Sequence, residues 1–273
     1  MPFALCYINN RFQPYTETSL HISDLGLQRG FAIFDYFLEM DGRIPFFDDY
    51  LDRFYTSAES LNLEVPLSRE LLKEKVSYLL QQNNFGRSGI KLLLTGGFSD
   101  DLYAPSAPNF IVLNMPLKHN PCEFGEGVKL MLSEYQRFQP EVKTTFYLPS
   151  LIHYQKMIEQ GAIELLYHQN GLISETTRAN IFLIRKNTLI TPGNGILRGI
   201  TRKHVLLVAE KLMKVEIRNV AVEELWRSEE VFITGTSKHV MPVVKIDDTV
   251  IGDGKPGSIT KSVSEAFEKY YSI

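Results

Sequence analysis

The chain has 273 residues, of which 44% are hydrophobic, and its formal net charge is −3. This length and apolar content allow a large buried core, and the interspersed charges exclude a basic stripe for nucleic acid or a polybasic membrane patch. No run reaches the roughly 20 apolar residues of a membrane span and no basic signal-peptide start is present, so we expect a cytoplasmic protein that binds a small molecule.

The first part of the chain predicts a compact α+β unit. Hairpins are expected around residues 9–10 and around the Asp41-Gly42 turn in GFAIFDYFLEMDGRIPFF, where two aromatic-rich strands flank the turn. Two amphipathic helices are predicted next, in FDDYLDRFYTSAESLNL, with Arg53 off the apolar stripe, and in SRELLKEKVSYLLQQNN, which begins at a serine cap. GIKLLLTGG and NFIVLNMPL predict strands.

The polar, proline-containing stretch LKHNPCEFGEG indicates a boundary between two domains. We predict a small N-terminal α+β domain at 1–117, a linker at 118–126 and a larger C-terminal domain at 127–273. The chemically suggestive segments lie in the larger domain.

In FQPEVKTTFYLPSLIHYQKM, Lys143 is expected just after a strand and just before a helix. A lysine is usually a solvated surface charge, but one held among apolar residues can have a depressed pKa and attack an aldehyde to form a Schiff base.

Two further segments predict places where an anion could bind. GILRGITRKHVLLVAEKL is a glycine turn that leads into a helix, so the amides of Gly199, Ile200 and Thr201 would face a phosphate, although many helices begin with glycine for capping alone. VFITGTSKHVMPV is a strand that ends in a loop containing Thr236, which is either a simple turn or an anion cradle.

The segment LISETTRANIF places a carboxylate, Glu175, three residues before a guanidinium, Arg178, at the start of an apolar strand. Together, LDRFYTSAESL, EVKTT, ISETTRANIF, LRGITR and TGTS resemble the fold-type IV pyridoxal-phosphate enzymes, the class IV aminotransferases. This family includes D-amino-acid transaminases, branched-chain aminotransferases and aminodeoxychorismate lyases. The resemblance covers almost the whole chain and implies a two-domain α+β fold of the D-amino-acid aminotransferase type.

The resemblance also implies the cofactor and its partners. Pyridoxal 5'-phosphate would lie in the interdomain cleft, where Lys143 forms the internal aldimine and moves the substrate's α-proton. Glu175 would pair with the pyridine nitrogen and favour its protonated form, and Tyr147 would contact the phenolate oxygen. Family members are at least dimers, so we expect a homodimer that uses an amino acid and a 2-oxo acid.

The phosphate of the cofactor would be held by four groups, according to the same resemblance. They are the Arg53 guanidinium, the amides of Ile200 and Thr201, and Thr236. Without the resemblance, Arg53 would more simply be an exposed helix arginine paired with an acid of DDYLD.

The substrate is less clearly indicated. D-amino-acid transaminases carry a carboxylate-binding arginine after the LLLT strand, where this chain has Gly96 and Gly97, and a tyrosine where it has Phe34. Two other arginines, Arg29 and Arg178, could bind the substrate carboxylate, as arginine does best through a bidentate fork. Alternatively, Arg178 pairs with Glu175, and Arg29 is a solvated turn residue.

These features predict a transaminase for D-amino acids such as D-alanine or D-glutamate. A branched-chain L-amino-acid aminotransferase is an alternative, although the hairpin RGFAIFDYF lacks that group's usual GxGxFEG-like pattern. An aminodeoxychorismate lyase is a second alternative, and a non-enzymatic protein that binds a phosphorylated ligand is a third.

Overall fold

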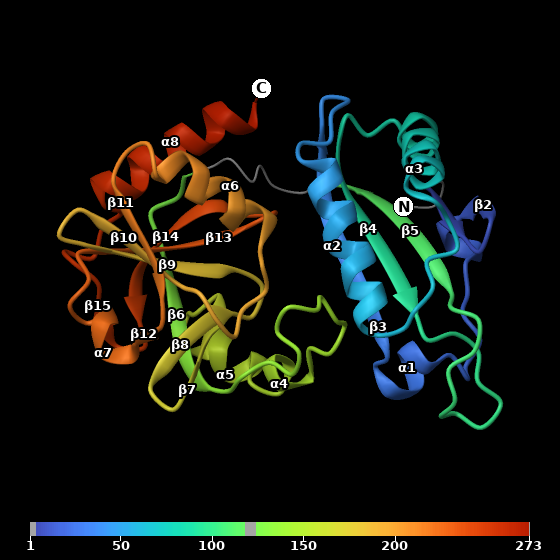
Figure 1. Ribbon diagram of the computed structural model, residues 1–273, viewed down its shortest axis with the longest axis horizontal. Helices are drawn as coiled ribbons and strands as arrows, with labels where there is room; N and C mark the ends of the chain where they lie inside the picture. The colour runs from blue at the N-terminus through green and yellow to red at the C-terminus, as the bar shows by residue number, and fades with distance from the viewer. Residues whose placement is uncertain (1–3, 118–123, 273) are drawn as a thin grey trace. The chain divides into compact units, whose positions relative to one another are not determined.

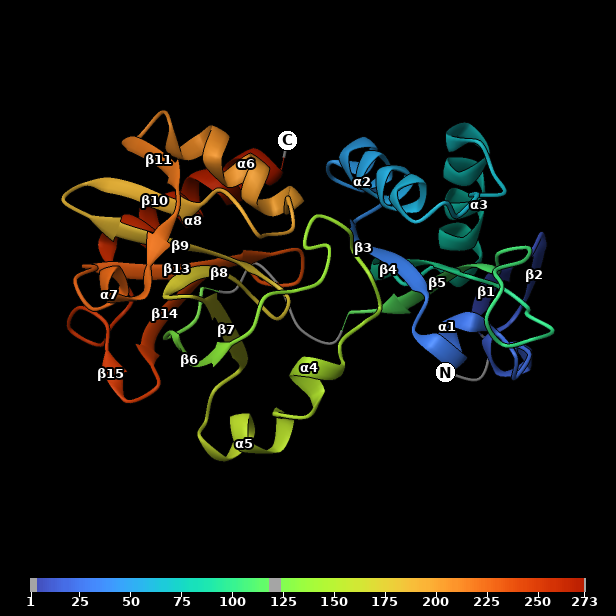
Figure 2. The same cartoon turned by 60° about the horizontal axis from the view of Figure 1, so that its bottom comes forward.

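The computed structural model describes residues 4–117 and 124–272. The chain forms two compact units, Met1–His119 with Val142–Phe146 and Asn120–Glu141 with Tyr147–Ile273 (Figures 1 and 2). The predicted linker lies largely outside the described residues. The segment Val142–Phe146, which contains Lys143, follows the linker in sequence but packs with the first unit, whereas the sequence had placed it in the second.

The first unit is a five-stranded antiparallel sheet in the order β2-β1-β5-β4-β3. Its strands are β1 (Leu5–Ile8), β2 (Arg11–Pro14), β3 (Ala32–Met40), β4 (Arg87–Thr95) and β5 (Phe110–Pro116). Its helical elements are η1 (Tyr15–Glu17), α1 (Leu25–Arg29), α2 (Phe47–Ser60) and α3 (Arg69–Asn83). Helices α2 and α3 cover one face of the sheet (Figure 2).

The structure confirms the hairpin at residues 9–10, where both asparagines have positive φ. The second predicted hairpin is wrong, because only an isolated bridge joins Met40 to Arg43 and no strand follows it. Pro45 cannot donate a ladder hydrogen bond, and Phe46, with a φ of 57°, leads the chain directly into α2. Strand β3 therefore pairs with β4 along its whole length.

A buried ion pair joins α2 to β3. Asp35 is fully buried in β3, and Arg53 of α2 donates to both of its oxygens, from Nε at 2.9 Å and from Nη2 at 2.7 Å. Neither residue could be buried alone at an acceptable cost in free energy. The partner of Arg53 in this pair is thus an acid of the sheet, not one of the helix acids of DDYLD.

The second unit is built on a sheet that closes on itself. The strand order β11-β10-β9-β13-β14-β6-β7-β8-β12 is completed by a β8–β9 pairing, so that six strands from β9 through β13, β14, β6, β7 and β8 form a ring. Apolar side chains of these strands, including Leu130, Leu166, Ile181, Val231 and Val243, form its core. The ring holds the ends of β8, β9 and β13 in fixed register.

The strands of the second unit are β6 (Val128–Glu134), β7 (Glu164–Gln169), β8 (Leu172–Thr176), β9 (Asn180–Arg185), β10 (Thr188–Pro192), β11 (Lys214–Arg218), β12 (Val220–Ala221), β13 (Glu230–Gly235), β14 (His239–Ile246) and β15 (Thr249–Val250). Its helices are α4 (Leu148–Leu151), α5 (Tyr154–Glu159), α6 (Ile200–Ala209), α7 (Val222–Leu225) and α8 (Ser258–Tyr271). Helix α6 packs on α8 and β13 (Figure 1). No helix within 4–117 or 124–272 is both long and apolar enough to cross a membrane.

We predict that Asp35→Ala destabilises the protein strongly, because it leaves the Arg53 guanidinium in the core without its counter-charge. Breaking a buried pair in this way typically costs about 3–5 kcal/mol. Urea unfolding of the purified variant measures the loss of free energy directly.

The matched control is Asp41→Ala, which removes the acid of an exposed ion pair with Arg87 in the same unit. Exposed pairs contribute little to stability, so this variant should unfold close to the wild type. Equal unfolding midpoints for the two variants would contradict the importance of the buried pair.

Candidate active site

Lys143 lies in an irregular segment, and the strand before it, β6, ends at Glu134. The prediction that Lys143 directly follows a strand is therefore wrong. Instead its backbone is fastened to the first unit, since the Lys143 carbonyl accepts from the Phe34 amide at 2.9 Å and its amide donates to Ser57 Oγ at 3.4 Å. The Lys143 ammonium lies 4.7 Å from the centre of the Phe34 ring. The lysine is thus held beside β3 and α2.

Arg53 is one helical turn before Ser57 on α2, so it projects from the side of the helix that contacts the Lys143 backbone. The structure therefore brings Arg53 and Lys143 to the same helix. Asp35 accepts from two of the three guanidinium nitrogens and orients the group. The phosphate-binding role of Arg53 stays a prediction.

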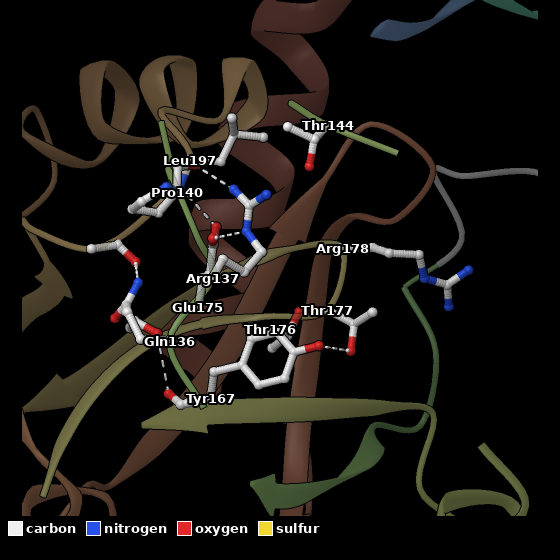
Figure 3. Close-up of polar contacts among 12 residues, drawn as sticks. Gln136, Arg137, Pro140, Thr144, Tyr167, Glu175, Thr176, Thr177, Arg178 and Leu197 are labelled. Atoms are coloured by element: carbon white, nitrogen blue, oxygen red, sulfur yellow. Dashed lines mark hydrogen bonds and ion pairs between the residues drawn. The ribbon is translucent and has the colours of Figure 1, made fainter. Parts of the chain in front are cut away.

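Glu175 is almost fully buried at the end of β8, where both of its oxygens are hydrogen-bonded. One oxygen accepts from Arg137 Nε at 2.7 Å and the other from the Leu197 amide at 2.9 Å (Figure 3). The guanidinium of Arg137 favours the charged carboxylate. Sequence reasoning missed Arg137, because it lies in a loop with no periodic pattern around it.

Arg178 does not pair with Glu175, as one of the sequence alternatives had it. Its Nε and its backbone amide both donate to Glu164, each at 3.0 Å, and its side chain is directed away from Glu175 (Figure 3). Glu164 is fully buried and also binds Lys238, whose Nζ lies at 2.7 Å. Burial alone would raise the pKa of Glu164, but Lys238 and Arg178 together hold it below its usual value.

The turn before α6 is tightly built. Asn180 Nδ2 donates to the Leu197 carbonyl at 2.9 Å, and a Cβ at Gly199 would come within 2.1 Å of Asn180 Oδ1. The Gly199 amide donates to the Leu197 carbonyl, so the expectation that it faces an anion is wrong. Ile200 and Thr201 form the first turn of α6, and in the described chain no side chain caps this helix.

Arg202, which follows these two residues on α6, is a second buried cation that sequence reasoning missed. Its Nη2 donates to the Pro192 carbonyl at 2.9 Å, while its Nε has no partner among the described residues. Burial and the nearby Arg198 lower the pKa of the Arg202 guanidinium. An anion at the start of α6 would stabilise this charge, so the site suits a phosphate group.

Tyr147 lies in the second unit beside the charges of the Glu164 and Glu175 clusters. Burial is the main cause that raises the pKa of Tyr147 to about 12. Arg137 lowers this pKa, and Glu164 and Glu175 raise it further. The phenol is therefore protonated at neutral pH and can donate a hydrogen bond. Thr236 lies in the turn between β13 and β14, two residues before Lys238.

The remaining predicted substrate residues, Arg29 and Phe34, belong to the first unit. Arg29 ends α1 with an exposed side chain, and its Nη1 donates to the Gln28 carbonyl at 3.2 Å. Phe34 is half-buried in β3, beneath the ammonium of Lys143.

Comparison with known proteins shows the family. Residues 32–246 match the family model of amino-transferase class IV, and the chain belongs to this family of pyridoxal-phosphate enzymes. It is 30% identical to a Methanocaldococcus jannaschii protein named "Putative branched-chain-amino-acid aminotransferase", over 96% of this chain and 94% of the other. It is 29% identical to a D-alanine aminotransferase of Bacillus licheniformis, over 95% and 94% of the two chains.

The fold also matches solved structures. The crystal structure of the Escherichia coli branched-chain amino acid aminotransferase superimposes with a TM-score of 0.91, at 23% identity over 98% of this chain and 95% of that one. The branched-chain enzyme from Thermobaculum terrenum, solved in its PLP form, gives a TM-score of 0.88 at 22% identity, over 99% and 94% of the two chains. The predicted two-domain, fold-type IV architecture is confirmed.

Pyridoxal phosphate is the cofactor of this family, and the residues present fit it. The chain offers an amine at Lys143, a charged carboxylate at Glu175, and an α6 start where Arg202 Nε has no described partner. These suit the aldehyde, the ring nitrogen and the phosphate of the cofactor, respectively.

We predict that Gly199→Ala weakens cofactor retention roughly tenfold and destabilises the protein by about 1–3 kcal/mol, the usual scale of overpacking. A Cβ there forces Asn180 away and loosens the Leu197 turn, although Gly199 has an ordinary φ of −60°. Cofactor absorbance after dialysis and a thermal melt measure the two effects.

Gly125→Ala is the matched control, because its Cβ would meet nothing within 4 Å. It should retain the cofactor like the wild type. If Gly199→Ala behaves like this control, the α6 turn does not depend on close packing against Asn180.

Proposed function

We propose that this enzyme is a transaminase that exchanges an amino group between a D-amino acid, such as D-alanine or D-glutamate, and a 2-oxo acid. D-alanine aminotransferases at 26–29% identity, over most of both chains, support this choice among the members of the family. The substrate side of the site supports it further.

Bound pyridoxal phosphate supplies an aldehyde that condenses with amines and a ring that withdraws electrons from the substrate's α-carbon. In this proposal Lys143 Nζ would hold the cofactor through its aldehyde group and would take and return the proton at the substrate's α-carbon. The two backbone hydrogen bonds that fasten Lys143 to Phe34 and Ser57 hold the base in place for this transfer.

Glu175 is proposed to accept a hydrogen bond from the protonated ring nitrogen of the cofactor. The ion pair with Arg137 keeps the carboxylate charged, and the Leu197 amide fixes its second oxygen. Arg53, the Ile200 and Thr201 amides and Thr236 are proposed for the phosphate. The protonated Tyr147 is proposed to donate to the phenolate oxygen.

The observation that carries the proposed replacement of the carboxylate-binding group is that the usual arginine position is sterically closed. A Cβ at Gly96 would lie 2.5 Å from the Phe31 ring, and one at Gly97, where φ is +78°, would lie 1.8 Å from the Ala107 carbonyl oxygen. An arginine at either position would clash with its surroundings, so in this proposal other groups bind the substrate carboxylate.

Arg178 and Arg29 are the proposed replacements. Glu164 is one carboxylate shared by two cations, Arg178 and Lys238, so this cluster keeps a net positive charge. The Arg178 side chain is also 58% exposed, which leaves it accessible to an anion. Arg29 is exposed and, within the described residues, has no acidic partner.

A branched-chain L-amino-acid aminotransferase remains the second candidate, favoured by the name of the 30% identical relative. A lyase that releases pyruvate from aminodeoxychorismate would need no 2-oxo-acid acceptor, so product analysis separates it. The family resemblance further supports a cytoplasmic homodimer as the working form.

We predict that the wild type reacts faster with D-alanine or D-glutamate than with L-leucine or L-glutamate when cofactor absorbance is followed in single half-reactions. Arg178→Ala and Arg29→Ala should each raise the Michaelis constant for the D-amino acid by about ten- to a hundredfold, because a charged hydrogen bond is lost.

Arg87→Ala is the control, because it removes an exposed arginine of the first unit that pairs with Asp41 and should leave the kinetics unchanged. A wild type that prefers L-leucine would overturn the D-amino-acid proposal. Unchanged Michaelis constants in both arginine variants would remove them from the site.

A further inference from the structure

The turn between β13 and β14 contains Thr236, which the proposed function assigns to the cofactor phosphate. Two consecutive residues hold this turn to separate elements. Lys238 Nζ lies 2.7 Å from a carboxylate oxygen of Glu164 in β7. His239 Nδ1 lies 2.7 Å from Glu268 Oε1 in α8. The contact with Glu164 belongs to the cluster described above, whereas the contact with Glu268 brings α8 to the same turn.

His239 has a backbone conformation that disfavours most side chains. It is the first residue of β14, it is only 2% exposed, and its φ is 47°. Glycine and asparagine adopt this left-handed conformation more readily, so a histidine here costs free energy. The ring packs against two aromatic rings of α8, with centres 5.3 Å away at Phe267 and 4.4 Å away at Tyr271. The contacts with α8 therefore offset the backbone strain of the turn.

Glu268 also occupies a locally unfavourable position. It lies in the last turn of α8, which ends at Tyr271, and the helix dipole disfavours an acid there. The nitrogen of His239 gives this carboxylate a partner. Two residues that local rules disfavour are thus joined beside the turn proposed for the phosphate. Departures of this kind collect at functional sites, where a contact between elements compensates them.

The other end of α8 is fixed to the same hairpin. Glu230, the first residue of β13, accepts from the amides of Ile259 and Thr260 at 3.0 and 2.7 Å. An acid at this end of the helix is favourable. Helix α8 also packs on α6, where the ring of Tyr270 lies 5.6 Å from that of His204 (Figure 1). Helix α8 is therefore joined to both segments proposed for the phosphate, the β13–β14 turn and α6.

We propose that α8 positions the phosphate-binding turn through the hydrogen bond between Glu268 and His239. Both are then positioning residues for cofactor retention, although neither touches the cofactor. The proposal rests on the assignment of Thr236 to the phosphate in the proposed function and is independent of the substrate. It gives a role in cofactor binding to a helix that supplies none of the proposed cofactor contacts.

The test compares Glu268→Ala with the wild type in two measurements that need no substrate. Alanine favours a helix, so α8 stays formed while His239 loses its partner. The dissociation constant of pyridoxal phosphate should rise about tenfold, the scale of one hydrogen bond to a charged group. The phosphorus NMR signal of the cofactor in the saturated holoenzyme should also shift, because the surroundings of the phosphate change. A loss of stability alone would not move this signal.

His239→Gly separates the contact from the backbone strain, because glycine adopts a positive φ without strain. It should bind the cofactor as weakly as Glu268→Ala. The double variant should bind no more weakly than either single variant, since both substitutions remove the same hydrogen bond. The matched control is Glu265→Ala, which removes an exposed acid from the same helix and should equal the wild type in both measurements.

Equal dissociation constants and phosphorus signals in Glu268→Ala and Glu265→Ala would overturn the inference. A Glu268→Ala protein that melts at a lower temperature but binds the cofactor normally would do the same, because the contact is then purely structural. Thr236→Ala with unchanged cofactor binding would overturn the assignment of the turn and the inference with it. A wild type that prefers L-leucine in the half-reactions would overturn only the D-amino-acid proposal.

Discussion

The two hydrogen bonds that the Glu175 carboxylate accepts are the interactions on which the candidate residues of the second unit depend for their positions. They connect three separate pieces of chain, the end of β8, the loop with Arg137 and the turn at Leu197 before α6. Asn180 holds the same turn from β9, and the closed ring of strands fixes β8 against β9. The group proposed for the ring nitrogen and the helix start proposed for the phosphate are therefore spaced by one rigid turn.

Charged residues interrupt apolar strands in both units, and they differ in whether an opposite charge lies beside them. Asp35 in β3 and Glu164 in β7 are each fully buried and compensated by cations from another element, which ties α2 to β3 and the β13–β14 turn to β7. Lys91 in β4 lacks such a partner among the described residues. Because breaking a buried pair costs folding free energy, the two compensated pairs also fix the elements that they join.

The sequence predicted the fold class, most helices and strands, and the family, because apolar periodicity and five ordered motifs carry that information. The sequence did not predict the positions of side chains whose partners come from other elements of the fold. Arg137 sits in a loop without any pattern, and the partners of Arg178 and Arg53 come from strands far away in sequence. A simpler signal was available but overlooked, since Asp35, Lys91 and Glu164 all stand inside apolar strand segments.

The central claim is that a charged Glu175, held by Arg137 and Leu197, keeps the cofactor's ring nitrogen protonated. Nitrogen NMR of holoenzyme carrying cofactor labelled at that atom tests it most directly. We predict a protonated ring nitrogen in the wild type at neutral pH and an unprotonated one in Glu175→Gln. The same protonation state in both proteins would contradict the account.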